Sequence, residues 1–401
     1  MVNIGIIGYG TVGSGVFEVL NINSKNIEIK AGEKIKVKRI CDLRKFPGDV
    51  AENLITHDFN DILNDDEITV VVETMGGIKP AYNFVKASIE AGKSVCTSNK
   101  ELVAKFGASL IKLAKKHNVN FLFEASVGGG IPIIRPLNYS LTSEEIIEIK
   151  GILNGTTNFI LTKMNDEGLD YETVLKEAQA MGYAEKNPTA DVEGFDTCRK
   201  IAILTSLAYG KQVDFENIRT EGITKITKED MEYAKVLNTY IKLIGESKKE
   251  NGVVYARVAP ALINKEQPLY AVHDVFNAIF IKGNMLDDVM FYGRGAGKLP
   301  TASAVVSDVI DAVKHKNRHI AIIWEEDKLE LGDIKEYKQR FFVRVPENMK
   351  ESAKRQMPEL EEVKAETVKG EFAFITTYLT ENELENAAKE LNVINKIIVN
   401  F

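Results

Sequence analysis

Six residues near the N-terminus, Gly8-Tyr9-Gly10-Thr11-Val12-Gly13, constrain the fold of this chain more than any other feature. They follow a strand-like apolar run and open a helical pattern. In this position the first glycine allows a tight turn, the second lets the backbone approach a pyrophosphate, and the third permits close packing of helix on strand. The N–H groups at the start of the helix suit the phosphates. We expect a dinucleotide to contact Gly8, Gly10, Thr11, Val12 and Gly13.

Apolar runs and helical patterns alternate through the first 130 residues. The runs have the length and the β-branched bias of buried parallel strands. The expected strands are 4–7, 37–41, 69–72, 94–97 and 120–123, and the expected helices include 80–91 and 107–117. This alternation predicts an α/β fold with a Rossmann-type doubly wound parallel sheet.

The pattern changes twice farther along the chain. Strands expected at 146–153, 252–259 and 278–282, with helices at 156–164, 171–181 and 196–209, predict an inserted α+β substrate-binding and dimerisation domain over 134–299. An amphipathic helix at 300–314 is expected to dock back on the first domain, which then comprises 1–133 and 300–318. After residue 318, the order of expected elements approximates a small βαββαβ domain over 319–401.

Composition excludes several classes of protein. The 401 residues carry a net charge of −7, and Lys and Arg are dispersed, so nucleic-acid binding is disfavoured. No apolar run is long enough to span a membrane. The N-terminus has no basic region or cleavage site of a signal peptide. The cysteines, Cys41, Cys96 and Cys198, lack metal-ligand spacing and are typical of free thiols in a reducing cytoplasm.

The residues for the adenosine end of the cofactor allow two interpretations. Asp42 ends the second expected strand, 32 residues past Gly10 because of a polar insertion around 21–33. A carboxylate there suits the ribose 2′-OH of NAD. Arg44 and Lys45 follow at once and suit the 2′-phosphate of NADP. The choice between NAD and NADP stays open.

Two further strand ends carry polar residues that would face a bound cofactor. Thr74 follows the third strand, and Lys100 follows the run Cys96-Thr97-Ser98-Asn99. In open parallel sheets ligands bind beyond the carboxyl ends of the strands, so both side chains are candidates for the site. For Lys100 the alternative is a solvated lysine at the start of a helix.

The block from Gly182 to Lys200 has an unusual density of charge. It holds four carboxylates, among them Glu185, Asp191 and Asp196, ahead of an apolar helix. Asp196 and Lys200 are four residues apart and share a helical face. A lysine held beside carboxylates can donate a proton. The alternative is ordinary surface charge, because exposed pairs of this kind are common and weak.

Three loops complete the set of candidates. The run 124–132 is rich in glycine and backbone carbonyls, which suits a hard cation or, equally, an inter-domain hinge. The run 151–158, with Gly155 and Thr156, places hydroxyls and amides at a strand-to-helix turn, which suits a substrate carboxylate or helix capping. The loop 292–297, ending in Gly297, is expected to close over the nicotinamide or to serve as a flexible joint.

Taken together, these motifs resemble homoserine dehydrogenases in order and spacing over roughly residues 1–318. The resemblance implies interconversion of L-homoserine and L-aspartate 4-semialdehyde with NADP or NAD, on the route to threonine, isoleucine and methionine. It further implies a homodimer or higher oligomer. The residues after 318 resemble an ACT domain, a small amino-acid-binding unit, which implies threonine as an effector.

The resemblance also assigns roles to residues. It makes Lys200, Asp196 and Lys100 catalytic, with Lys100 between nicotinamide and substrate. It places Glu185 on the substrate ammonium, near Asp191, with Tyr183 also at the substrate and Gly182 at the cofactor. It implies a sodium ion bound by the Glu124 side chain and by main-chain oxygens, which belong to Val127, Gly129 and Ile131. Ala190 stands where relatives often have an acidic residue, so that neighbour of Asp191 has no such role here.

The implied chemistry is hydride transfer coupled to a proton on the substrate oxygen, which a lysine ammonium can stabilise and protonate. Alcohol oxidation is therefore expected to accelerate toward alkaline pH. Two alternatives remain: a phosphorylating semialdehyde dehydrogenase, which needs a cysteine nucleophile and a histidine base, and a non-catalytic sensor of nucleotide and amino acid.

Overall fold

A computed structural model describes all residues, 1–401, and divides them into two compact units. The first comprises 1–144, 202–215 and 293–329, and the second comprises 145–201, 216–292 and 330–401. Each unit is described by itself below. No helix has the length and apolarity needed to cross a membrane.

The first unit is built on a six-stranded, wholly parallel sheet with strand order β3-β2-β1-β4-β5-β6. The strands are β1 (Val2–Ile7), β2 (Ile35–Cys41), β3 (Ile55–Thr56), β4 (Ile68–Glu73), β5 (Ser94–Thr97) and β6 (Phe121–Leu122). The order reverses at β1, and ligands of such sheets bind beyond the carboxyl ends of the strands at this switch point, here β1 and β4. The prediction of a doubly wound parallel sheet is confirmed.

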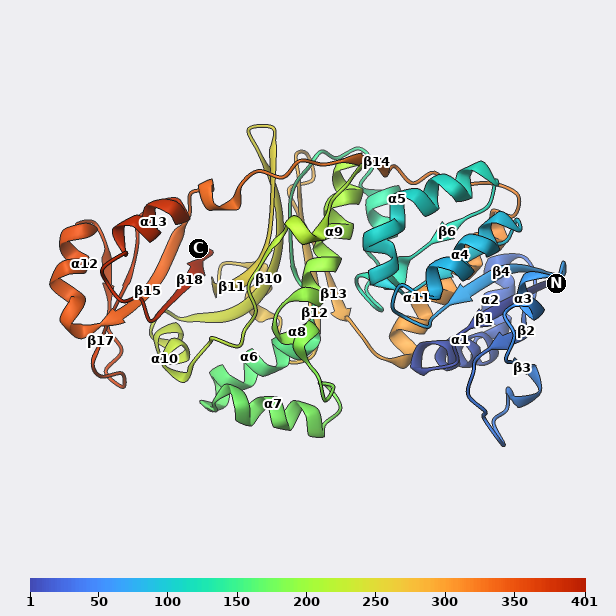
Figure 1. Cartoon of the computed structure of the whole chain (residues 1–401), viewed down its shortest axis with the longest axis horizontal. Helices are drawn as coiled ribbons and strands as arrows, with labels where there is room; N and C mark the ends of the chain where they lie inside the picture. Colours follow the sequence, from blue (N-terminus) through green and yellow to red (C-terminus); the bar gives the residue numbers. More distant parts are fainter. The chain divides into compact units, whose positions relative to one another are not determined.

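Helices connect these strands (Figure 1). They are α1 (Thr11–Ile22), α2 (Ser24–Ala31), α3 (Asn60–Leu63), α4 (Ala81–Glu90) and α5 (Lys100–Lys116). The polar insertion at 21–33 is thus largely helical, because Ile27 and Ala31 of α2 reach the core. Helix α5 begins at Lys100, seven residues before the predicted start at 107, and Asn99 caps its first turn. Two short strands, β8 (Lys211–Gln212) and β14 (Glu325–Lys328), pair separately.

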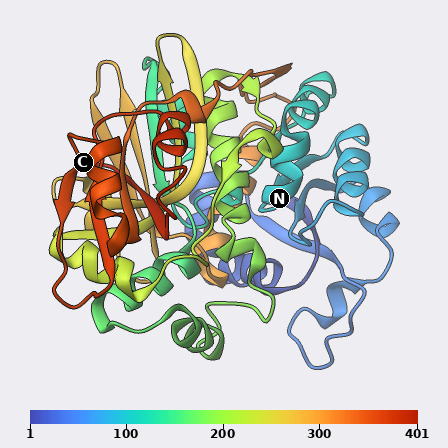
Figure 2. The ribbon, with the colours of Figure 1, turned by 60° about the vertical axis from the view of Figure 1, so that its left-hand side comes forward.

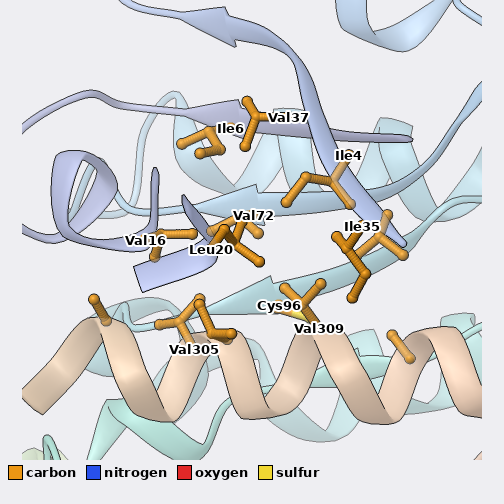
Figure 3. Packing of buried hydrophobic residues seen from close by; sticks show 14 of the residues in the cluster. Ile4, Ile6, Val16, Leu20, Ile35, Val37, Val72, Cys96, Val305 and Val309 are labelled. Carbon is orange, nitrogen blue, oxygen red and sulfur yellow. The ribbon is translucent and has the colours of Figure 1, made fainter. Parts of the chain in front are cut away.

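Helix α11 (Lys298–Lys314) packs on the same core, as the sequence predicts. Its Val305 and Val309 point toward the strands, on the side where Val72 of β4 and Cys96 of β5 lie (Figure 3). At Gly15 on α1 an added Cβ would lie 2.8 Å from the Lys298 carbonyl oxygen, so the two helices touch through their backbones.

The second unit centres on a large mixed sheet with order β13-β12-β7-β10-β11-β18-β15-β17-β16. Its first strands are β7 (Ile146–Ile152), β10 (Thr239–Glu250), β11 (Val253–Asn264), β12 (Phe276–Gly283) and β13 (Asp288–Arg294), and β9 (Arg219–Thr220) pairs with β11. The helices before β10 are α6 (Gly155–Glu167), α7 (Tyr171–Ala180), α8 (Thr189–Val192), α9 (Phe195–Tyr209), which crosses between the units in sequence, and α10 (Lys228–Val236).

Strand β10 is the largest element that the sequence analysis does not predict. Its second half reads Glu246-Ser247-Lys248-Lys249-Glu250, which suggests solvated charge. The structure pairs Glu246 with Arg257 of β11 at 2.5 Å and with Lys150 of β7 at 3.4 Å. Charges on one face of a strand are compatible with the sheet because the neighbouring strands supply their partners.

The C-terminal elements follow the predicted βαββαβ order. They are β15 (Arg340–Pro346), α12 (Lys350–Gln356), β16 (Glu361–Val363), β17 (Glu371–Ile375), α13 (Glu381–Ala387) and β18 (Asn395–Val399). These elements gather in one group, coloured orange to red in Figures 1 and 2, and enclose a core of their own. Strand β18 pairs in parallel with β11 at Ala261 and Leu262, so this group also continues the sheet of the second unit. A separate third domain stays a prediction.

Candidate active site

The glycine loop of the first unit has the geometry needed to hold a dinucleotide. Gly8 follows β1 with a φ of +93°, which favours glycine, and α1 begins at Thr11. No side chain caps the first turn of α1, so its N–H groups face outward. A Cβ on Gly13 would lie 2.0 Å from the Gly8 carbonyl oxygen, which shows how tightly helix and strand end approach. The Thr74 hydroxyl donates to the same oxygen at 2.8 Å and braces the loop.

Asp42 and Arg44 lie beside this loop as an ion pair. The Arg44 guanidinium contacts Asp42 at 2.8 Å, and the Tyr9 backbone N–H donates to the same carboxylate at 2.7 Å. These bonds hold the pKa of Asp42 well below its usual range, with the Arg44 side chain as the largest cause. Arg44 also lies over the Phe46 ring at 5.2 Å and is largely exposed. The carboxylate and the guanidinium are therefore both present where a ribose is expected, which leaves the choice of cofactor open.

A buried carboxylate that sequence reasoning passed over organises the next two strand ends. Glu73 is fully buried at the end of β4, and burial raises its pKa. It accepts hydrogen bonds from the Thr97 hydroxyl at 2.6 Å and the Met75 N–H at 2.8 Å. The Asn99 amide donates to Gly77 O at 2.6 Å, and its oxygen caps α5. This network places Lys100 at the first position of α5, at the carboxyl edge of the sheet.

The glycine-rich run after β6 is held by an ionic cluster. The Glu124 carboxylate, 1% exposed, accepts the N–H groups of residues 133, 134 and 135 at 2.6, 2.9 and 2.9 Å. Arg135 in turn pairs with Asp308 and Asp311 of α11. Asp308 is buried, which together with the nearby carboxylates raises its pKa to about 8. Sequence reasoning did not find this role of α11.

The remaining residues of that run approach the loop before α11. Gly129 has a φ of +56°, and a Cβ there would lie 2.2 Å from the Gly295 carbonyl oxygen. Gly297, with a φ of +122°, directly precedes α11. None of the backbone hydrogen bonds of the loops ends on the carbonyl oxygens of the four residues that the resemblance assigns to sodium, Glu124, Val127, Gly129 and Ile131. No group of three or more carboxylate, histidine or cysteine side chains has metal-binding geometry.

The second unit brings Asp196 and Lys200 together in a buried network. The Lys200 ammonium contacts the Asp196 carboxylate at 2.8 Å and donates to the Leu153 carbonyl oxygen at 2.7 Å. Asp196 is 2% exposed and Lys200 is 8% exposed. The pair is therefore not the solvated surface charge that the sequence left as an alternative.

Asn154 joins this pair to Asp191. Its amide nitrogen donates to Asp191 at 2.7 Å and to Asp196 at 2.9 Å, while its oxygen caps α6 by accepting the Thr157 N–H. The sequence indicated binding of a substrate carboxylate or helix capping for this run, and not the bonds to Asp191 and Asp196. One side chain thus ties the start of α6 to the charged block that ends at Lys200.

The other predicted substrate residues lie near the start of α6. The Thr156 hydroxyl donates to the Tyr183 carbonyl oxygen at 2.6 Å, and the Tyr183 ring packs edge-on to Phe159. Gly155 opens α6. Glu185 is exposed, and Gly182 ends the α7 segment with a φ of +75°. Gly182, predicted to contact the cofactor, belongs to the second unit, and the glycine loop belongs to the first.

None of the three cysteines has the environment of a nucleophile. All are buried, and burial raises the pKa of Cys41 to about 11 and also raises the pKa of Cys96 and Cys198. A phosphorylating dehydrogenase needs a thiolate at neutral pH, so this arrangement argues against that alternative.

A doubly wound sheet, a glycine loop at its switch point and a buried lysine–carboxylate pair in a second unit define a nicotinamide-dependent dehydrogenase. Family models support this class: the NAD-binding domain of homoserine dehydrogenase matches residues 8–124, and the homoserine dehydrogenase model matches residues 132–310. The chain belongs to the homoserine dehydrogenase family. It is an oxidoreductase that interconverts L-homoserine and L-aspartate 4-semialdehyde with a nicotinamide cofactor.

Individual relatives agree with this assignment. The chain is 41% identical to the homoserine dehydrogenase of Bacillus subtilis, covering 78% of this chain and 73% of that protein. A homoserine dehydrogenase structure from Thiobacillus denitrificans matches with a TM-score of 0.91 at 34% identity, over 100% of this chain and 98% of that one. A hyperthermophilic archaeal homoserine dehydrogenase in complex with NADPH matches with a TM-score of 0.66 at 30% identity, over 78% of this chain and 97% of that one.

Proposed function

We propose that Lys200 and Asp196 manage the proton on the substrate oxygen in the homoserine dehydrogenase reaction. The observation that carries this proposal is the buried contact of 2.8 Å between the two groups, with Leu153 O as a second acceptor for the lysine. A bound nicotinamide supplies or accepts the hydride. In aldehyde reduction, the ammonium of Lys200 stabilises the charge on the carbonyl oxygen and donates the proton. Asp196 orients the ammonium and keeps it charged.

The substrate is proposed to bind around the start of α6. Gly155 and Thr156 offer the backbone N–H groups of a helix N-terminus, which favours a carboxylate. Asp191, with Glu185 on the adjoining loop, supplies negative charge for the substrate ammonium. Tyr183 borders the same segment through its bond to Thr156.

The cofactor is proposed to lie along the carboxyl edge of the parallel sheet. Gly8, Gly10, Thr11, Val12 and Gly13 would hold the pyrophosphate, with Thr74 bracing the loop. Gly182 and Gly297 are proposed to contact the nicotinamide end, and Lys100 to act beside it. We infer that NADP is accepted as well as NAD, because the exposed Arg44 guanidinium and the Asp42 carboxylate lie together where the ribose is expected.

A sodium ion is proposed to bind the run 124–131. The main-chain oxygens of Glu124, Val127, Gly129 and Ile131 are the proposed ligands, because hard cations prefer oxygen and none of the loop hydrogen bonds ends on these atoms. The Glu124 carboxylate instead accepts three backbone N–H groups, so its carbonyl oxygen rather than its side chain is the proposed sodium ligand. An ion held this way would stiffen the loop.

The C-terminal group, residues 319–401, is proposed to be an ACT-like domain that binds threonine as an effector. It borders a hollow of about 770 Å³, counting the part open to solvent, whose lining includes the apolar Leu384 and Val393. Glu221, Lys225 and Lys396 also line it, so charges of both signs are present for a zwitterion. Titrating the full chain with threonine tests this, since Glu221→Gln should weaken any inhibition and leave the uninhibited rate unchanged.

Assembly and location complete the proposal. The family resemblance supports a homodimer or higher oligomer formed through the second unit, which sedimentation would measure. Three free, buried cysteines are consistent with work in a reducing cytoplasm.

The central test compares two lysines of the same block. Lys200→Met should lower kcat for homoserine oxidation about 10³-fold with the fold and cofactor binding retained. Lys186→Met, at an exposed position, should leave kcat unchanged. A Lys200→Met variant with normal turnover would refute the assignment and would favour a reaction in which another group handles the proton.

A further inference from the structure

A second lysine of the second unit is more deeply buried than Lys200 and has no place in the reaction described so far. Lys242 lies on β10, is 0% exposed and is among the largest fully buried side chains of the chain. Its ammonium donates to the Asn158 side-chain oxygen at 3.0 Å and to the Val272 carbonyl oxygen at 2.6 Å. Its charge also lies 5.0 Å from the centre of the Tyr240 ring.

Both acceptors of the Lys242 ammonium, Asn158 and Val272, lie at or beside the start of α6, where the substrate is proposed to bind. Asn158 is on the first turn of α6, and its amide nitrogen donates to Val272 O at 3.2 Å and Phe276 O at 3.0 Å. Gly155 approaches the same segment so closely that a Cβ would lie 2.8 Å from the Val275 carbonyl oxygen. The start of α6 is therefore fixed against the segment 272–276, with Lys242 bonded to both.

The Lys200–Asp196 pair bonds to the two residues directly before this first turn. Directly before α6, the Leu153 carbonyl oxygen accepts a hydrogen bond from Lys200, and the Asn154 amide donates one to Asp196. A shift of the α6 start would move these contacts together. Reacting groups are sensitive to such shifts, because a misplacement of about 1 Å can cost roughly 100-fold in rate.

A buried ammonium is costly for the fold, so packing alone does not explain Lys242. Burial lowers its pKa to about 7, against the opposing charges of Asp166 on α6 and Asp274 within the segment 272–276. His273 lies nearby, and burial followed by the Lys242 charge lowers its pKa as well. An aliphatic side chain would fill the same space without the desolvation penalty.

We propose that Lys242 is a positioning residue for the homoserine site: it locks the first turn of α6 to the segment 272–276 and thereby sets the geometry of Leu153, Asn154 and the Lys200–Asp196 pair. The inference rests on the proposed function, since it assigns the substrate to this turn.

The test uses a matched buried lysine as control. Lys93 of the first unit is 4% exposed and also donates to two carbonyl oxygens, Asp65 O and Ile68 O, both at 2.7 Å. It lies at the amino end of β5, away from the carboxyl edge of the sheet. Lys242→Met and Lys93→Met therefore remove comparable contacts, and only Lys242→Met should change the kinetic constants for homoserine.

For Lys242→Met we expect a fall of about 10- to 100-fold in kcat/KM for homoserine, with a raised homoserine KM and an unchanged KM for the cofactor. Lys93→Met should lower the melting temperature and leave both KM values unchanged. Equal kinetic constants in the Lys242→Met and unmodified enzymes would overturn the inference, as would an equal loss in Lys93→Met.

Two further variants cover a failure to fold. If Lys242→Met yields no folded protein, Lys242→Gln, which keeps an amide donor, is assayed in its place. If that also fails, Asn158→Ala removes the same contact from the other side and should raise the homoserine KM. Unchanged constants in the variant that folds would overturn the inference.

Lys200→Met separates the inference from the proposed function. If that variant keeps its turnover, the proposed function fails. If it loses turnover while Lys242→Met keeps its homoserine KM, only the role of Lys242 fails.

Discussion

The two units build their parts of the site from different materials. In the first, the proposed cofactor site consists mainly of backbone: a left-handed Gly8, a Gly13 too close to Gly8 O for any side chain, and the uncapped start of α1. In the second, the proposed substrate site is a network of buried side chains, in which Asn154, Asp196 and Lys200 bond to one another or to carbonyl groups.

This difference implies different sensitivities to mutation. A backbone site tolerates changes in side chains but fails when a Cβ enters a closed space. A buried polar network fails when one partner is removed, because the remaining groups lose their bonds without regaining water. Substitutions in the two units therefore test the comparison directly.

The largest effect is expected in the side-chain network. Asp196→Asn keeps the shape of the residue but removes the charge that orients Lys200, so kcat for homoserine oxidation should fall about 10³-fold. The KM for the cofactor should not change. The control is Glu193→Gln in the same block, which should retain its rate. A small effect of Asp196→Asn would mean that shape rather than charge matters in this unit.

The next effect concerns stability and pH. The folded pKa of Lys242, about 7, lies below the ordinary 10.5, so between these values the unfolded chain binds more protons than the folded one. The free energy of unfolding should therefore rise with pH in this window, by on the order of 3 kcal/mol from pH 7 to pH 10 through this residue. Denaturant titrations at each pH give the free energy of unfolding of the unmodified chain and of Lys242→Met, and the difference between the two isolates this contribution. A difference that is constant with pH would contradict a buried, titrating lysine.

A smaller effect is expected in the backbone site. Gly13→Ala forces a Cβ to 2.0 Å from Gly8 O and should destabilise the first unit by about 2 kcal/mol while raising the cofactor KM. In Gly10→Ala the nearest atom to the added Cβ is the Arg44 guanidinium at 3.8 Å, so stability should be preserved and only cofactor binding weakened. Thermal melting and cofactor KM together measure this. Equal melting temperatures would show that the loop yields more easily than its geometry implies.

The smallest effect tests the one side-chain element of the first unit. Arg44→Ala should lower kcat/KM for NADP about tenfold relative to that for NAD, because the guanidinium is proposed to meet the 2′-phosphate. The ratio of the two specificity constants is the measurement. If the ratio does not move, Lys45 is the next candidate, and the Asp42–Arg44 pair serves the loop alone.

Much of the fold could be predicted because its signals are local. Strand β5 has the predicted limits, and β1, β2 and β4 differ by only a few residues, since buried parallel strands are continuous apolar runs. Strand β10 could not be found this way, because its charged half is stable only beside Lys150 and Arg257 from distant parts of the chain. Helix α2 was not predicted within the polar insertion 21–33, because its few buried residues give little periodicity.

The residues of the candidate site likewise divide into those with a local sequence signal and those without one. Lys200 and Asp196 were found through their spacing of four residues, and the glycine loop through its position after β1. Glu73, Lys242 and the links made by Asn154 were not found, because nothing in their local sequence distinguishes a buried, bonded polar residue from an exposed one.

The amino-acid sequence by itself determined the doubly wound sheet, the place of the dinucleotide loop and the family of the chain, since these depend on short-range backbone requirements and apolar periodicity. Only the tertiary structure decided that the Lys200–Asp196 pair is buried, that Asn154 joins it to Asp191, and that Lys242 bonds to Asn158 on the same turn of α6. These contacts join residues up to 84 positions apart. Their stability comes from the exclusion of water, which is a property of the packed molecule rather than of any segment.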